Sequence, residues 1–229
     1  AEEEVILAGD AAMLSFFAEM PPQTARAVLA HAAALSRAGQ SGDAQANIVL
    51  FWRTRPMDAT MQALFLAEHG DLLKPHHAAR LDAMLWDRAH TAARQMFELV
   101  RKEDIQLAEV RIALQRRAGN VNALINALSP AQADDPGLKH DRFEWRIRNK
   151  VTADAKTLLL ATSTSAQALG RPEAWANRRR GLARGEMRSG DKKRAYQMAS
   201  QHFLDGGSDY ADLEWLSGYI ALRFLRDPE

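Results

Sequence analysis

The stretch QTARAVLAHAAALS, residues 23–36, decides the fold class of this chain. Ala27, Ala30 and Ala34 stand three and four residues apart, with Val28 beside them, so one apolar stripe runs along one side of a helix. Short breakers containing proline or glycine separate this stretch from others of the same kind. Similar periodicity predicts helices near residues 43–53, 58–69, 77–86, 89–101, 104–118, 120–128, 138–149, 152–161, 172–189, 192–203 and 210–226.

The composition agrees with an all-α soluble protein. The 229 residues are 47% hydrophobic and 26% charged, which is ordinary for a globular chain with a real core. Alanine, leucine, arginine and glutamine favour helices, whereas the scarcity of β-branched residues argues against a large sheet. The net charge of +1 gives no indication of a partner.

The absence of cysteine and the hydropathy pattern exclude several kinds of site, but they do not fix the cellular compartment. The chain has no cysteine, which excludes disulfides, thiolate metal sites and cysteine nucleophiles. No apolar run approaches the roughly 20 residues that cross a bilayer, so we expect no transmembrane segment. Ala1, followed by three glutamates, fits either a mature end left by cleavage or an artificial boundary.

A weak internal repeat indicates how the helices are arranged. Three segments, residues 84–97, 146–159 and 186–199, each read as a helix end, a polar turn and a second helix. An alanine stands nine residues into each segment, at Ala93, Ala155 and Ala195. Alanine permits close approach of neighbouring helices, and we expect tight contacts there. The unequal intervals favour an irregular α-solenoid or superhelix of helix hairpins, similar to tetratricopeptide arrays, over a regular 34-residue repeat. Chance similarity among alanine-rich helices is the alternative.

The last predicted helix is apolar on two faces. Leu213, Leu216, Ile220 and Phe224 form one face, and Asp209 is the expected N-cap. The second face carries Trp215, Tyr219 and Leu222. A helix that is apolar on two faces is buried on two sides, either within the fold or against a part that these residues do not include.

A basic stripe is the candidate binding site. Arg180, Arg184 and Arg188 recur every four residues and therefore share one face of a helix. Such a stripe attracts an anionic polymer. Its alternative is a solvated face that pairs with acids such as Glu186 and Asp191.

No other group of residues in the sequence predicts a metal, cofactor or catalytic site. His76 and His77 are adjacent, and His69 and His90 lie nearby, but the spacing lacks an HExxH pattern. Surface histidines around the Pro75 turn explain them, and we expect neither metal nor cofactor. Hydrolase and nucleotide-binding motifs are absent. Acids such as Asp134 and Asp135, or Glu103 and Asp104, are interpreted as helix caps or solvated residues. The five tryptophans fall in helical, apolar patterns, which favours packing over sugar stacking for most of them.

Several stretches together resemble one enzyme family. They are RLDAMLWD at 80–87 with Ala92, Ala93 and Arg94 after it, DPGL at 135–138, DRFEWRIR at 141–148, RPEAWANRRR at 171–180, AYQMASQH at 195–202 and DLEWLSGYIALR at 212–223. The chain resembles, over residues 75–229, the N-terminal superhelical (U-type) domain of soluble lytic murein transglycosylases. These are packing motifs, so they indicate a family better than a reaction.

The resemblance implies a periplasmic domain of superhelical helix pairs spanning residues 1–229. In the family a lysozyme-like domain follows, where one glutamate cleaves the β-1,4 bond between MurNAc and GlcNAc and leaves a 1,6-anhydro-MurNAc end. The family's Glu-Ser and Gly-Leu-Met-Gln motifs are absent from this chain. We therefore assign no catalytic residue, and we expect a non-catalytic scaffold that positions or restricts glycan strands.

Two further functions remain as alternatives. A stand-alone helical-repeat module that binds peptides or proteins fits the same pattern. A nucleic-acid-binding solenoid that uses the arginine stripe is the third function, and we rank nucleic acid below peptidoglycan as a partner.

Overall fold

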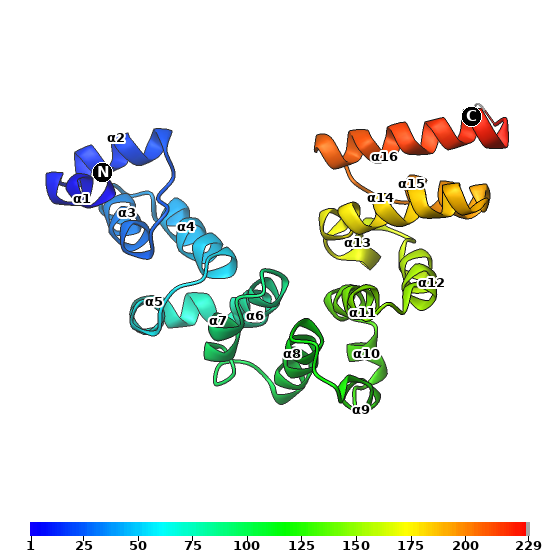
Figure 1. The fold of residues 1–229 in the computed structure, drawn as a ribbon. Coiled ribbons are helices and arrows are strands. Elements are labelled where there is room, and N and C mark those ends of the chain that lie inside the picture. The colour runs from blue at the N-terminus through cyan, green and yellow to red at the C-terminus, as the bar shows by residue number, and fades with distance from the viewer. Residues whose placement is uncertain (228–229) are drawn as a thin grey trace. The chain divides into compact units, whose positions relative to one another are not determined.

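The computed structural model describes residues 1–227, and every regular element within them is helical (Figure 1). The all-α class expected from the sequence is confirmed. Contacts between residues divide the chain into two compact units, Ala1–Ala108 and Glu109–Glu229. The single superhelical domain expected over residues 1–229 stays a prediction beside these two units.

The first unit contains short helices joined by short turns. Its elements are α1 (Glu2–Ala8), α2 (Asp10–Glu19), α3 (Ala25–Arg37), α4 (Ser41–Thr54), α5 (Ala59–Leu73), the 3₁₀ turn η1 (Lys74–His76), α6 (His77–Trp86), α7 (His90–Gln95) and the first part of α8 (Lys102–Gln115).

Residues 25–37 form helix α3, and Ala27, Val28 and Ala34 of its apolar stripe are buried. The side-chain oxygen of Thr24 accepts a hydrogen bond from the backbone N–H of Ala27 at 3.2 Å and so caps the helix. Ala27 and Ala34 are fully buried against Met13 and Phe17 of α2. The hairpin of α3 and α4 is visible in blue in Figure 1.

A buried arginine ties α6 to the end of α4. The guanidinium of Arg80 is completely buried, and its carbon lies 4.5 Å from the centre of the Trp52 ring. One of its nitrogens donates to the carbonyl oxygens of Trp52 and of Arg55, the second at 2.8 Å. A cation therefore satisfies carbonyls at the negative end of a helix. Burial lowers the pKa of Arg80 to about 10.

The second unit begins within α8 and includes α14, which at 18 residues is the longest helix among residues 1–227. Its further elements are α9 (Val121–Asn126), α10 (Pro130–Ala133), α11 (Pro136–Arg148), α12 (Thr152–Thr162), α13 (Ala166–Leu169), α14 (Pro172–Ser189), α15 (Lys192–Ser200), α16 (Gly207–Ile220) and the π-helical turn η2 (Ala221–Leu225).

The core of the second unit lies among α11, α12, α14, α15 and α16. Phe143 packs on Trp175 with ring centres 4.9 Å apart, and both side chains are fully buried. The indole N–H of Trp175 donates to the carbonyl oxygen of Leu169 at 3.0 Å, so this buried donor has a hydrogen-bond partner. Leu216 and Ile220 of α16 complete the same cluster.

One turn geometry recurs between successive helices. The second residue after the helix has a positive φ, and the backbone N–H of the residue that follows it donates to the carbonyl five residues earlier, as in a Schellman cap. The left-handed residues are Gly39 (φ 81°), Arg88 (58°), Arg117 (61°) and Lys150 (65°). The corresponding bonds join Gln40 to Leu35 at 2.8 Å, and Ala89 to Met84, Ala118 to Ala113 and Val151 to Arg146 at 2.9 Å each.

Each alanine of the proposed repeat stands at the same distance after a left-handed residue. Ala93 and Ala155 stand five residues after the left-handed Arg88 and Lys150, and Ala195 stands five residues after Gly190, whose φ is 108°. All three alanines are fully buried, as expected. Ala44 holds the same place after Gly39 and is also buried, which adds a fourth member that the sequence pattern missed.

The predicted helix over residues 89–101 is wrong in its second half. Helix α7 ends at Gln95, and residues 96–99 form turns with bonds such as Leu99 N–H to the Met96 carbonyl at 2.9 Å. Side chains of α5 and α6 form hydrogen bonds with backbone carbonyl groups in this segment. The amide of Gln62 donates to the Gln95 carbonyl at 3.1 Å, and Nδ1 of His77 lies 3.2 Å from the Leu99 carbonyl oxygen.

Candidate functional site

The predicted arginine stripe lies on α14, but the structure holds its first member in place. The Arg180 side chain is only 23% exposed, and its guanidinium forms ion pairs with Asp209, at 3.1 Å, and with Asp212 of α16. These contacts join α14 to α16. Arg180 therefore packs two helices together and has less freedom to contact a polymer.

The other two members of the stripe remain available. Arg184 is half-buried and Arg188 is exposed, and neither forms an ion pair within residues 1–227. The acids that were expected to neutralise them are engaged elsewhere. Glu186 pairs with Lys156, and the Asp191 side chain accepts from the backbone N–H of Arg194 at 3.0 Å as the cap of α15. Exposed Lys193 follows on the next helix, α15, after the turn at Gly190.

The two arginines before the stripe have structural positions. Arg178 pairs with Glu144 at 3.3 Å. Arg179 is fully buried and donates to the Met198 carbonyl at 3.0 Å and to the Ser163 hydroxyl at 2.6 Å. Burial lowers the pKa of Arg179 to about 10. We therefore reduce the candidate cationic site to Arg184, Arg188 and Lys193.

Helix α16 buries one of its two apolar faces. Leu213, Leu216 and Ile220 are buried, as expected, whereas Phe224, which was predicted on the same face, is 39% exposed. The expectation that Asp209 is the N-cap is wrong, because the helix begins at Gly207 and its N-cap is Gly206. Asp209 instead lies in the first turn, where Arg180 pairs with it.

The second apolar face of α16 is exposed. Trp215 is 63% exposed and Leu222 is 65% exposed, and Tyr219 lies between them. The rings of Trp215 and Tyr219 stack with centres 5.4 Å apart and planes 9° apart. This face is the largest exposed aromatic group among residues 1–227 and matches no solvated-surface pattern.

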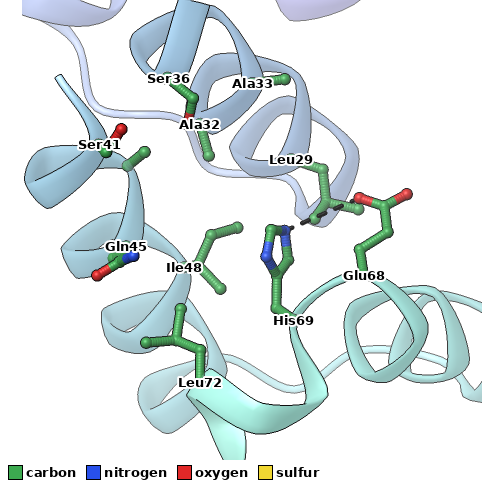
Figure 2. Close-up of a pocket in the computed structure, with 11 residues that line it drawn as sticks. Leu29, Ala32, Ala33, Ser36, Ser41, Gln45, Ile48, Glu68, His69 and Leu72 are labelled. Carbon is green, nitrogen blue, oxygen red and sulfur yellow. Dashed lines mark ion pairs between the residues drawn. The ribbon is translucent and has the colours of Figure 1, made fainter. Parts of the chain in front are cut away.

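A small cavity lies in the first unit between α3, α4 and α5 (Figure 2). Its volume is about 230 Å³. Helix α5 kinks at His69 (φ −134°, ψ 20°), and the imidazole points into the space between Leu29 and Ile48. Nε2 of His69 lies 3.8 Å from a carboxylate oxygen of Glu68. The walls are Leu29, Ala32, Ala33, Ser36, Ser41, Ala44, Gln45, Ile48 and Leu72.

The size of this cavity limits what it can hold. Small-molecule sites usually measure about 300–1,000 Å³. At about 230 Å³, the cavity is smaller than a usual small-molecule site. A second depression of about 190 Å³ lies beside Pro21, Pro22 and Phe51, next to Leu50, which is 63% exposed.

The remaining candidates take structural roles. His77 is buried, so the expectation of a surface histidine there is wrong. No cluster of three potential metal ligands occurs among residues 1–227. Asp135 accepts from the backbone N–H of Leu138 at 2.7 Å and caps α11, as interpreted from the sequence. Trp52 and Trp175 are core residues, whereas Trp215 departs from the expected packing.

Two further findings concern membrane-spanning helices and similarity to known proteins. No helix within residues 1–227 is long and apolar enough to cross a membrane. Comparisons with protein-family models, curated proteins and solved structures found no match. The function proposed below therefore depends on the geometry of α14–α16 and on the resemblance seen in the sequence.

Proposed function

We propose that this chain is a non-catalytic helical scaffold of a peptidoglycan lytic transglycosylase that acts in the periplasm. The parent enzyme would cleave the MurNAc–GlcNAc β-1,4 bond and leave a 1,6-anhydro-MurNAc end. The scaffold contacts glycan strands and restricts how they reach the catalytic domain. Its partners are peptidoglycan and the lysozyme-like domain of the parent protein.

The observation that supports this proposal most directly is the uncompensated cationic site on α14. Arg184 and Arg188 have no ion-pair partner within residues 1–227, and exposed Lys193 at the start of α15 adds a third charge. The stem peptides of peptidoglycan carry carboxylates, which such a site attracts. Helix α14 also lies in the stretch, residues 171–229, where the resemblance to the family is strongest.

The recurring hairpins support the finer fold assignment within this proposal. The same left-handed turn follows α3, α6, α8 and α11, and a buried alanine follows three of these turns at the same distance. A series of such units builds an irregular α-solenoid, in which each hairpin buries its apolar face on the next. Solenoids in general present extended, curved surfaces, and such a surface would suit a long polymer.

A sacculus pull-down with paired variants tests the proposal. Replacing Arg184 and Arg188 together by glutamine should abolish co-sedimentation and leave thermal stability nearly unchanged, because neither forms an ion pair. Arg180→Gln is the matched control. It should keep co-sedimentation and lower stability, since it removes the contacts to Asp209 and Asp212. Binding that survives in the double variant would place the glycan elsewhere.

Salt dependence gives a second criterion. Exposed charges are screened over about 8 Å at physiological ionic strength, so an electrostatic contact should weaken as salt rises. Co-sedimentation that does not change with salt would contradict a cationic site.

A helical-repeat module that binds peptides is the second candidate function. The depression beside Pro21, Phe51 and the exposed Leu50 favours it, because apolar grooves between helices accept peptide side chains. Binding of a peptide library that Leu50→Asp abolishes, with no affinity for sacculi in the wild type, would support this candidate over the scaffold.

A further inference from the structure

The exposed face of α16 has the composition of a helix–helix interface. Ala211, Trp215, Gly218, Tyr219 and Leu222 follow one another at intervals of four, three, one and three residues, so they share one side of the helix. All five are exposed. Ala211 and Gly218 leave depressions between the large side chains, which is how packed helices interdigitate.

The large side chains on this face are held in place before any partner binds. Trp215 stacks on Tyr219, and the Phe224 ring meets Tyr219 edge-on with centres 5.7 Å apart. The ammonium of Lys192 lies 4.4 Å from the centre of the Phe224 ring. Association therefore loses little side-chain freedom, which favours binding.

The two ends of the face carry opposite charge. At the first end, Asp209 and Asp212 share the single cation Arg180, so a negative charge is left over. At the other end, Arg223 and Arg226 are exposed and form no ion pair within residues 1–227. The face is therefore complementary to itself when one copy is reversed.

From this charge pattern we propose that the exposed face of α16 binds a second copy of this chain through an antiparallel, two-fold symmetric helix pair. Asp212 and Arg223 lie on the same edge of the helix, and in an antiparallel pair like edges meet. The two-fold axis then passes near residues 217 and 218. Asp212 faces Arg223 of the other copy, and Trp215 packs beside its Tyr219, in a self-complementary contact.

The size of the face predicts a weak dimer. Residues 211–222 span roughly 16 Å along a helix. A fully covered aromatic side chain buries about 150–250 Å², so two of them and Leu222 contribute less than the roughly 800 Å² per partner of a standard interface. We expect a monomer–dimer equilibrium that depends on protein concentration.

Sedimentation velocity over a range of concentrations is the first test. The wild type should shift from monomer toward dimer as concentration rises, and Trp215→Ala should stay monomeric. Leu50→Ala is the matched control, since Leu50 is equally exposed at 63% but lies on α4. It should dimerise like the wild type. A wild type that remains monomeric at every concentration would overturn the proposal.

A charge exchange tests the antiparallel arrangement. Arg223→Glu and Asp212→Lys should each dimerise less than the wild type, because each places like charges across the axis twice. Mixed together, the two variants should form a heterodimer with both ion pairs restored, and circular dichroism would verify that each is folded. Failure of the mixture to recover, with both variants folded, would exclude the proposed register.

Cross-linking locates the axis independently. The chain has no cysteine, so a single introduced thiol reports one distance. An added side chain at Gly218 meets nothing within 4 Å, and the same holds at Gly181 on α14. Under oxidation Gly218→Cys should form a covalent dimer, and Gly181→Cys should not. Equal cross-linking at both positions would indicate random collision and would count against the proposal.

A different occupant would also be visible in these experiments. If the wild type stays monomeric and soluble glycan strands quench Trp215 fluorescence, the face is a sugar platform and the dimer proposal is wrong. Failure of the dimer leaves the scaffold function of α14 untouched, because the sacculus experiment uses Arg184 and Arg188 rather than this face.

Discussion

Gly137→Ala should destabilise the second unit, although it places alanine inside a helix. Gly137 is buried in the first turn of α11, and a Cβ there would lie 2.2 Å from the central guanidinium carbon of Arg111. Carbon atoms in contact prefer about 3.5–4.0 Å. The Arg111 head group must therefore move by more than an ångström.

Movement of the guanidinium breaks a buried ion pair. Nε of Arg111 donates to Asp141 at 2.8 Å, and both side chains are almost completely buried. A hydrogen bond to a charged group contributes about 1.5–3 kcal/mol. Replacing glycine by alanine in a helix returns roughly 0.5–1 kcal/mol. We therefore expect a net loss of about 1–2 kcal/mol in the free energy of unfolding.

Urea unfolding followed by circular dichroism measures this loss, with Gly181→Ala as the matched control. Gly181 lies on the exposed side of α14, where an added Cβ meets nothing within 4 Å. Alanine there should stabilise the protein by about 0.5–1 kcal/mol. In an Arg111→Lys background, the slimmer ammonium should reduce the cost at Gly137. If Gly137→Ala and Gly181→Ala both raise the urea midpoint, the proposed close packing of Arg111 against Gly137 is wrong.

Two further perturbations test the packing. We expect Ala93→Leu, Ala155→Leu and Ala195→Leu each to lower the free energy of unfolding by about 1–3 kcal/mol, because the larger side chain overpacks the helix contact. Ala123→Leu, at an exposed position, should change it little. Unchanged urea midpoints at all three buried sites would mean that the alanine repeat is not structural. Burial lowers the pKa of His31 and of His77 below the ordinary 6.5, so the neutral rings add stability that is complete above about pH 6.5 and is lost as the pH falls below it. Replacing both by phenylalanine should flatten the change in urea midpoint between about pH 7 and pH 5, and an unchanged slope would refute this cause.

Periodicity was sufficient to predict most helices because their apolar stripes face local neighbours. The segments 172–189 and 77–86 coincide with α14 and α6. The short helix α10 was missed although its signal is present, since Ser129 and Gln132 form a capping box and Pro130 follows the cap. Helix α13 likewise begins directly after Ser165, whose hydroxyl caps it.

The errors have a tertiary cause. Helix α7 ends early because side chains from Gln62 and His77, distant in sequence, occupy the nearby carbonyls. The predicted end at His69 is a kink, after which α5 continues to Leu73. No local pattern carries this information.

The candidate site, too, could be predicted only in part from the sequence. The four-residue spacing places three arginines on one face, but it cannot show that Asp209 and Asp212 hold Arg180. The second apolar face of α16 was visible in the sequence, and the structure adds that this face is exposed.

Incubation of the pure chain with peptidoglycan sacculi tests the central claim most directly. The pellet is assayed for bound protein, and the supernatant is analysed by mass spectrometry for anhydromuropeptides. The scaffold account predicts co-sedimentation that weakens with salt, and no anhydromuropeptide release, since no Glu-Ser motif occurs in the chain. Release of anhydromuropeptides, absence of binding, or preference for DNA over sacculi at matched salt would contradict it.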